Sequence, residues 1–353
     1  MGLLFRQLYD IESGTFTYLL ADEENHEGVI IDSVYERHER DLALINELQI
    51  NLRYAIETHC HADHVTAAWL IRQQTNCQAA ASKASDIQGL DRVLGTGDAL
   101  TFGEFSLQVR ATPGHTPGCI SLFLPEPAMV FTGDCLLIRG CGRTDFQQGS
   151  AAILYHSITE QLFSLPNETL LCPGHDYDGR TTSTIGEEKA LNPRVGGDAN
   201  ERDFVGFLDN LRLPHPKKIA VAVPANLKLG EPDTPPVTPD WAPVTTTYAG
   251  ILEVSPQWVA AHGDQVHILD VRTRVETEEE PVQVAAAQLI PQNELRDRLT
   301  EVPTNKPVVT LCRSGRRSVM AFDILRKAGW AEVANIKGGL LAWYAEGLPI
   351  TQQ

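Results

Sequence analysis

The sequence is short of positive charge. It contains 29 lysines and arginines against 46 aspartates and glutamates, which gives a formal net charge of −17 at pH 7. Binding to nucleic-acid phosphates or to an anionic membrane surface needs clustered cations, so we expect neither a nucleic-acid nor a membrane partner. Apolar runs are also short, and none approaches the roughly 18 residues that a membrane-spanning helix needs.

Paired cysteines are missing as well. The seven cysteines are an odd number and include no CxxC motif, and the first ten residues lack the apolar core of a signal peptide. A chain of 353 residues can bury a large core without disulfides. We therefore expect free thiols and a reducing, cytoplasmic location.

Proline, by contrast, is concentrated in one place. Residues 231–243 read EPDTPPVTPDWAP, with five prolines in thirteen residues, which is typical of a stiff and extended linker. The length alone predicts about two domains. We expect a first domain at 1–230, a linker at 231–247 and a second domain at 248–353.

Short apolar runs bounded by turn residues predict buried strands in the first domain, with helical patterns between them. The strands are expected at 28–32, 53–57, 105–110, 119–124, 129–132 and 169–172, and the helices at 36–48, 66–75 and 151–165. In the second domain we expect strands at 267–271 and 307–311 and helices starting at Ser255-Pro256, at 294–299 and at 318–328. The alternation in this domain predicts a small parallel α/β fold.

Side chains with metal-ligand chemistry follow several of these strands. They are His59, His61, Asp63 and His64 in the stretch THCHADH, and then His115, Asp134 and His175. Loops at strand ends gather the site of an α/β fold, and imidazoles with carboxylates form a transition-metal ligand set with open positions. Seven potential ligands suffice for one metal or for two, so the residues alone leave this choice open.

The HxHxDH motif at 59–64, together with His115, Asp134 and His175, resembles the metallo-β-lactamase superfamily. The stretch 135–149, the NPR at 192–194 and the VPAN at 223–226 resemble its persulfide dioxygenase branch. The resemblance implies an αββα sandwich with one non-haem Fe(II). The implied ligands are His59, His115 and Asp134, while His61, Asp63, His64 and His175 are orienting groups or alternative ligands.

The same resemblance implies glutathione persulfide as substrate, oxidised by O₂ to sulfite and glutathione. The substrate carboxylates need cations or donors nearby. Candidates that flank the ligand loops are Arg143, Tyr177, Arg180 and Arg194, while Cys141 either handles persulfide or packs as a small residue. The alternative is a two-metal thioester hydrolase of the glyoxalase II kind with a tethered sulfurtransferase.

The second domain carries a cysteine between a predicted strand and a predicted helix. The stretch is Cys312, Arg313, Ser314, Gly315, Arg316, Arg317 and Ser318. Such a loop turns successive backbone N–H groups toward one point, and with three arginines it favours a nucleophilic thiolate and an anionic sulfur donor.

This loop, the LDVR at 269–272 and the GGLLAWYAEGLPI at 338–350 resemble the rhodanese (sulfurtransferase) domain. One departure is that EPVQVAAAQLIP at 280–291 replaces the usual Gly-His-Ile-Pro-Gly-Ala stretch. The resemblance implies sulfur transfer between thiosulfate and glutathione through a persulfide on Cys312. The whole chain is then a bifunctional enzyme of hydrogen sulfide metabolism, expected as a dimer or higher oligomer, and a non-catalytic sulfur-binding sensor is the remaining alternative.

Overall fold

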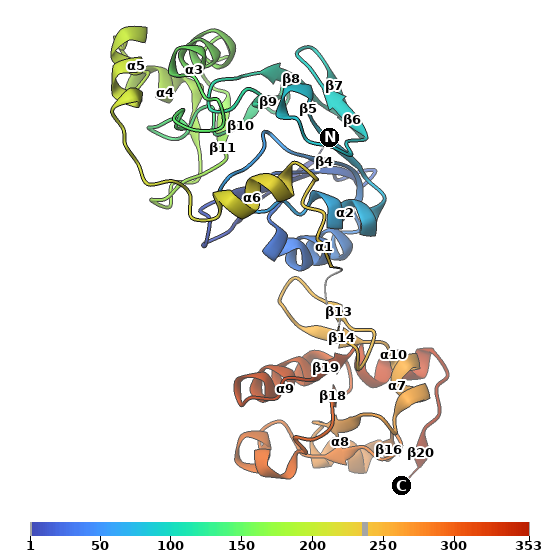
Figure 1. Ribbon diagram of the computed structural model, residues 1–353. Helices are drawn as coiled ribbons and strands as arrows, with labels where there is room; N and C mark the ends of the chain where they lie inside the picture. Colours follow the sequence, from blue (N-terminus) through green and yellow to red (C-terminus); the bar gives the residue numbers. More distant parts are fainter. Residues whose placement is uncertain (1, 235–238, 353) are drawn as a thin grey trace. The chain divides into compact units, whose positions relative to one another are not determined.

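A computed structural model describes residues 2–234 and 239–352, and the chain forms two compact units, residues 1–234 and 235–353 (Figure 1). The expected linker at 231–247 includes residues 235–238, which lie outside the described residues. Its later part is not a linker: Ala242 is buried in the second unit's core, with Trp241 and Val244 packed against the same cluster. These apolar side chains draw the segment onto the second unit.

The first unit contains two six-stranded sheets. One sheet has the order β1 (Leu3–Tyr9), β2 (Phe16–Asp22), β3 (Glu27–Ile31), β4 (Asn51–Ile56), β5 (Gln78–Ser82) and β6 (Arg92–Leu94). The other has the order β12 (Ser183–Thr184), β11 (Leu170–Pro173), β10 (Met129–Gly133), β9 (Ile120–Leu124), β8 (Phe105–Ala111) and β7 (Ala99–Phe102).

The two sheets pack face to face. Alternate residues of β2, such as Phe16, Tyr18 and Leu20, share one buried cluster with Leu107, Phe131 and other residues of the second sheet. Helices cover both outer faces, with α1 (His38–Glu47) and α2 (Ala68–Thr75) on one side and α3 (Ala151–His156), α4 (Ile185–Leu191) and α5 (Glu201–Asp209) on the other (Figure 1). The expected αββα sandwich is confirmed.

The strands expected from apolar runs match β3, β4, β8, β9, β10 and β11 within a few residues. The N-terminal strands β1 and β2, the short β5, β6, β7 and β12, and α4, α5 and α6 (Ile219–Asn226) were not predicted. The helix expected at 151–165 is α-helical only to His156 and continues as a π-helix over Ser157–Leu162.

The second unit contains a sheet of order β13 (Thr245–Thr246), β14 (Leu252–Val254), β19 (Val333–Ile336), β18 (Val308–Leu311), β15 (His267–Asp270) and β17 (Gln288–Leu289). All neighbouring pairs except β13 and β14 are parallel. The helices are α7 (Pro256–His262), α8 (Arg274–Glu279), α9 (Arg316–Lys327) and α10 (Gly339–Ala345), and a small sheet joins β16 (Val282–Gln283) to β20 (Thr351–Gln352). The predicted parallel α/β fold is confirmed.

In the second unit, the sequence predicts the start of one helix correctly and the type of another helix wrongly. Ser255 caps α7, because its hydroxyl accepts a hydrogen bond from the Trp258 N–H at 3.2 Å. The helix expected at 294–299 is wrong in type: Leu295–Glu301 is 3-10 helical and is interrupted at Arg298. Seven residues are too few for a stable α-helix without strong packing, and only Leu295 of this segment is buried.

All seven cysteines are unpaired and buried. Within the described ranges, no helix combines the length and the apolar character needed to cross a membrane.

Candidate metal centre and cysteine loop

Three side chains from three different strand ends converge in the first unit. His59 follows β4, His115 follows β8 and Asp134 follows β10, and one potential ligand atom from each lies within 4.8 Å of the other two. Both imidazoles are buried, and the Asp134 side chain is 15% exposed. The strand ends therefore bring together the three side chains that the family resemblance implies as ligands.

Hydrogen bonds fix which ring nitrogen each histidine presents. The Thr58 hydroxyl donates to Asp32 at 2.8 Å, so at its 3.0 Å contact with His59 Nδ1 it accepts the ring proton. His115 Nδ1 donates to the Arg143 carbonyl oxygen at 2.6 Å. Both rings thus keep Nε2 free as a ligand atom.

The donor set fits a divalent transition metal. Asp134 Oδ1 is buried and has no hydrogen-bond partner among the described residues. A buried carboxylate oxygen without a donor costs free energy unless a cation meets it. Two imidazoles and one carboxylate are a donor set that suits such an ion.

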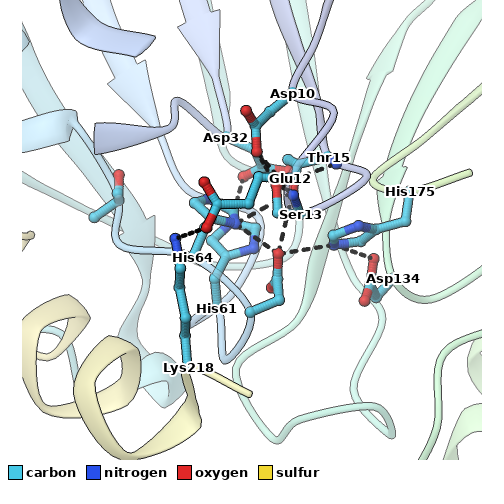
Figure 2. A network of polar contacts seen from close by, with 12 residues as sticks. Asp10, Glu12, Ser13, Thr15, Asp32, His61, His64, Asp134, His175 and Lys218 are labelled. Atoms are coloured by element: carbon cyan, nitrogen blue, oxygen red, sulfur yellow. Dashed lines mark hydrogen bonds and ion pairs between the residues drawn. The ribbon is translucent and has the colours of Figure 1, made fainter. Parts of the chain in front are cut away.

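A second cluster consists of His61, Asp63 and His175, and its His175 lies next to Asp134 of the first cluster (Figure 2). His175 Nε2 is 3.6 Å from Asp134 Oδ1 and 3.6 Å from Asp63 Oδ2, so it stands between the two groups. Asp63 Oδ2 also accepts from His64 Nδ1 at 2.8 Å and from the Thr15 hydroxyl at 3.1 Å. His61, Asp63 and His175 also lie close enough to share one ion.

Electrostatics separates the two histidines of the HxH motif. Burial, together with neighbouring imidazoles, lowers the pKa of His59 well below its usual range, so this ring is neutral and able to ligate. Burial opposes charge on His61 too, but Asp32 and Glu57, whose oxygens lie 3.2 and 3.3 Å from its Nε2, raise its pKa well above the usual value. His61 therefore carries a proton between two carboxylates.

A pocket of about 310 Å³ opens onto this centre. Its lining includes His115, Asp134 and all four residues predicted to bind substrate, Arg143, Tyr177, Arg180 and Arg194. Such a volume is at the small end for a ligand site and suits one small molecule.

The four substrate candidates differ in the charge they can offer. Arg143 is paired with Asp145 at 2.6 Å, and Arg180 is paired with carboxylates at 2.9 and 2.7 Å. Arg194 donates to the Cys141 carbonyl at 2.9 Å, and no carboxylate in the described parts of the chain pairs with it. Arg194 is therefore the cation of this pocket that an anionic ligand can neutralise.

Two further candidates have clear environments. Tyr177 is 72% exposed and stacks on His175 with ring centroids 5.7 Å apart, so it forms the rim of the pocket. Cys141 is 3% exposed within the core under α3, and burial raises the pKa of its thiol to about 11. These facts favour the reading of Cys141 as a packed small residue.

Several contributors were not predicted from the sequence. Thr15, Asp32, Glu57, Gln147 and Asn226 all hydrogen-bond to the ligand stretch 58–66. Asn226 belongs to the VPAN stretch, and its Nδ2 donates to the His61 and His64 carbonyls at 2.9 and 2.8 Å. A buried asparagine far along the chain carries no local pattern that assigns it to this loop.

The cysteine loop of the second unit runs from β18 into α9. Cys312 is fully buried, and the Ser318 hydroxyl lies 3.3 Å from its Sγ. Gly315 adopts φ +87° as the residue before α9, which only glycine does without strain. The Cys312 carbonyl accepts from the Leu340 N–H at 2.9 Å, so α10 helps to fix the loop.

The three arginines of this loop are not equivalent. Arg313 and Arg316 are exposed, as is Ser314, whereas Arg317 is held by both carboxylate oxygens of Glu276 from α8. The loop therefore offers Arg313 and Arg316 as cations without a carboxylate partner among the described residues. The stretch 280–291, which differs from the usual rhodanese sequence, contains β17, an edge strand beside β15.

Comparison with protein families gives two matches. Residues 11–175 match the metallo-beta-lactamase superfamily, and residues 255–346 match the rhodanese-like domain. The first range contains every candidate ligand, and the second contains the whole cysteine loop.

Several individual proteins are similar in sequence to the first unit. The mouse protein named persulfide dioxygenase ETHE1, mitochondrial, is 51% identical over 235 residues, which is 66% of this chain and 91% of that protein. A hydroxyacylglutathione hydrolase of Brucella ovis is 41% identical over 181 residues, 50% of this chain and 67% of that protein. The crystal structure of ETHE1 from Myxococcus xanthus superposes with a TM-score of 0.62 at 47% identity, covering 65% of this chain and all of that one.

Proposed function

Because this chain belongs to the persulfide dioxygenase family of the metallo-beta-lactamase superfamily and carries a rhodanese-like domain after it, we propose that it is a bifunctional enzyme of sulfur metabolism. The first unit oxidises glutathione persulfide, and the second transfers sulfur between thiosulfate and glutathione. The observation that carries the first assignment is the convergence of His59, His115 and Asp134 with both histidine Nε2 atoms free.

The oxidation balances as glutathione persulfide plus O₂ plus water giving glutathione, sulfite and two protons. A single Fe(II) held by His59, His115 and Asp134 would supply the redox chemistry of this oxidation. The protein supplies geometry: Thr58 and the Arg143 carbonyl hold the two imidazoles in one orientation. His61, Asp63, His64 and His175 form the polar surroundings that orient ligands and water.

Glutathione persulfide carries two carboxylates that need partners in the pocket. Arg194 offers its charge to one of them, since its present acceptor is only a backbone carbonyl. Arg143 and Arg180 shape the wall while paired to the chain's own carboxylates, and Tyr177 borders the opening. Arg194→Gln should therefore raise KM for glutathione persulfide by about tenfold, with a smaller change in kcat.

Sulfur transfer runs through Cys312 in the second unit. The thiolate attacks the outer sulfur of thiosulfate, the S–S bond to the sulfite group breaks, and Cys312 keeps the sulfur as a persulfide while sulfite leaves. Glutathione thiolate then takes that sulfur and regenerates Cys312. Backbone N–H groups of residues 313–318, with Arg313 and Arg316, provide the cradle for the anionic donor.

The test combines metal analysis with oxygen uptake on the full chain. We expect about one iron per chain, O₂ consumption with glutathione persulfide, and loss of that consumption after chelation with return on adding Fe(II). An iron-loaded protein that consumes no O₂ with this substrate would contradict the proposal.

One observation favours a second function, the two-metal hydrolysis of glutathione thioesters. His61, Asp63 and His175 could hold another ion, and the Brucella relative is named as a hydrolase. Two zinc ions per chain together with thioester cleavage would establish that alternative.

Oxygen uptake with glutathione persulfide also separates the dioxygenase from a sulfur-binding sensor, which would bind sulfur at Cys312 without turnover. The cytoplasmic location and the dimeric or higher assembly stay predictions.

A further inference from the structure

One short segment contacts the loops of all three proposed ligands. We call residues 142–149 the clamp segment. At its start, the Gly142 N–H donates to the Asp134 backbone carbonyl at 2.8 Å, and a Cβ on Gly142 would collide with that carbonyl. The next carbonyl, that of Arg143, receives the His115 Nδ1 proton. Two of the three ligand positions are thus tied to adjacent residues of one segment.

The far end of the clamp segment reaches the third ligand loop. Gln147 Nε2 donates to the Cys60 carbonyl oxygen at 2.9 Å, and Cys60 directly follows His59 in the chain. The two residues are 87 positions apart, so this contact joins separate parts of the fold. Gln147 is the residue of the clamp segment through which the His59 loop is held to the loops of His115 and Asp134.

Holding this contact requires an unusual backbone. Gln147 and Gln148 have φ values of +46° and +58°, a region that non-glycine residues rarely occupy. Residues held in such conformations persist only when surrounding contacts determine them, and they concentrate at functional sites. Phe146 supplies one such contact, because its ring meets His115 edge-on at a centroid distance of 5.8 Å.

The two consecutive glutamines differ in what they do. Gln147 is half-buried and its Oε1 atom is buried, whereas Gln148 is exposed and makes no side-chain hydrogen bond within the described ranges. They share side-chain chemistry and left-handed backbone, so Gln148 is a matched control. The same ligand stretch is held elsewhere by another amide, Asn226, through the His61 and His64 carbonyls.

We propose that Gln147 is a positioning residue of the metal centre, acting through the Cys60 carbonyl to set the place of His59 relative to His115 and Asp134. The inference rests on the proposed metal centre and adds a residue to its support. The Gln147 side chain need not touch metal or substrate. Removing its amide should therefore change the affinity for the ion and the geometry in which the ion is held. Groups that orient metal ligands typically change metal affinity by about 10–100-fold when removed.

The experiment compares Gln147→Met with Gln148→Met in the full chain. Methionine keeps the length of the side chain but cannot donate to Cys60. We expect Gln147→Met to lose Fe(II) to a chelator about tenfold faster than the parent, and its Co(II)-substituted form to show a shifted visible spectrum. Gln148→Met should match the parent in both, and the metal-free variants should unfold at similar temperatures.

Equal chelation rates and equal Co(II) spectra for the two variants would overturn the inference. If Gln147→Met does not fold, Gln147→Asn is the variant to test. The asparagine amide is one methylene shorter, so it should also lose the contact with the Cys60 carbonyl. Metal retention equal to that of the parent would then overturn the inference. A parent chain that binds no metal would instead contradict the proposed function, so the two failures can be told apart.

Discussion

In the first unit, the proposed metal centre is assembled from side chains that follow three different strands, whereas in the second unit the cysteine loop is a continuous stretch shaped by its backbone. His59, His115 and Asp134 are brought together by a sandwich of about 230 residues. Cys312 and its cradle need only seven consecutive residues, a left-handed glycine and the nearby start of α10.

This difference determines which kind of substitution should inactivate each site. A site made of side chains should fail when one chemical group is removed, even if the backbone is unchanged. A site made of backbone N–H groups should fail when a new side chain displaces the loop, even though the added atoms carry no chemistry.

Asp134→Ala should have the largest effect on the first unit. The change removes the negatively charged ligand, so iron content and persulfide-dependent O₂ uptake should fall by more than the roughly 100-fold expected of an orienting group. Sulfur transfer from thiosulfate to cyanide should stay within about twofold, since that site is built from other residues. Asp209→Ala, an exposed residue at the end of α5, is the control. Iron at one per chain in Asp134→Ala would falsify the ligand assignment.

Cys312→Ser should be equally severe for the second unit alone. A serine hydroxyl stays neutral at pH 7 and cannot carry the transferred sulfur, so thiosulfate-dependent O₂ uptake should vanish. Uptake with preformed glutathione persulfide should remain nearly unchanged. A drop of more than about tenfold, equivalent to about 1.4 kcal/mol of barrier, would show that the two sites are not independent.

Gly339→Ala tests the backbone-built site without touching its chemistry. A Cβ at this position would collide with the Cys312 carbonyl and come within 2.7 Å of the Gly315 nitrogen. The loop must shift, and a displacement of about 1 Å can cost about 100-fold in rate. Gly347→Ala is the matched control, because Gly347 also has positive φ but its Cβ would meet nothing within 4 Å. Steady-state sulfurtransferase rates compare the two variants, and similar rates would refute the idea.

His64→Ala should weaken the first unit by about 10–100-fold, well short of His59→Ala. His64 holds Asp63 through Nδ1 at 2.8 Å and lies outside the triad of His59, His115 and Asp134. Metal content and O₂ uptake should be measured for both variants. Equal and complete losses, with a second bound metal in the parent, would point to the two-metal hydrolase.

Glu276→Gln should give the smallest effect, one confined to acid. The hydrogen bond from Arg317 lowers the pKa of Glu276 to about 2 from an ordinary 4.5, so the pair stabilises the fold above pH 4.5 and is lost as the pH falls toward 2. The loss is at most about 1 kcal/mol for a partly exposed pair. Urea unfolding at pH 7 and pH 3, followed by tryptophan fluorescence, should show a smaller pH difference in Glu276→Gln than in the parent. An unchanged difference would mean that the pair contributes nothing.

Much of this architecture follows from local patterns in the sequence. Apolar runs located the strands that end at His59, Asp134 and His175, because a buried strand needs a run of apolar residues and its end is marked by polar ones. The place of the cysteine loop between a strand and a helix was predicted because the stretch is contiguous. The seven potential ligands also followed from these patterns, whereas the choice of His59, His115 and Asp134 among them came from the resemblance to the metallo-β-lactamase superfamily.

The parts that escaped prediction depend on contacts between distant segments. Gln147 and Asn226 act on carbonyls 87 and more than 160 residues away, and an amide has the same appearance in the sequence whether it faces water or a ligand loop. The positive charge available around Cys312 was also overestimated. Three arginines follow Cys312 in the sequence, but Glu276, 41 residues before Arg317, forms an ion pair with Arg317. Pairing of this kind is set by tertiary packing.

The burial of all seven cysteines has a consequence for an enzyme whose proposed substrates are reactive sulfur compounds. Persulfides exchange with any accessible thiolate, so a surface cysteine would turn the enzyme into a target of its own substrate. Burial raises the pKa of Cys60 and Cys119 to about 11 and 12, which keeps these thiols protonated and unreactive. Cys312 is buried as well, so the feature that distinguishes it is its loop of backbone N–H groups and arginines. Any other thiol that becomes labelled reports a local opening of the fold.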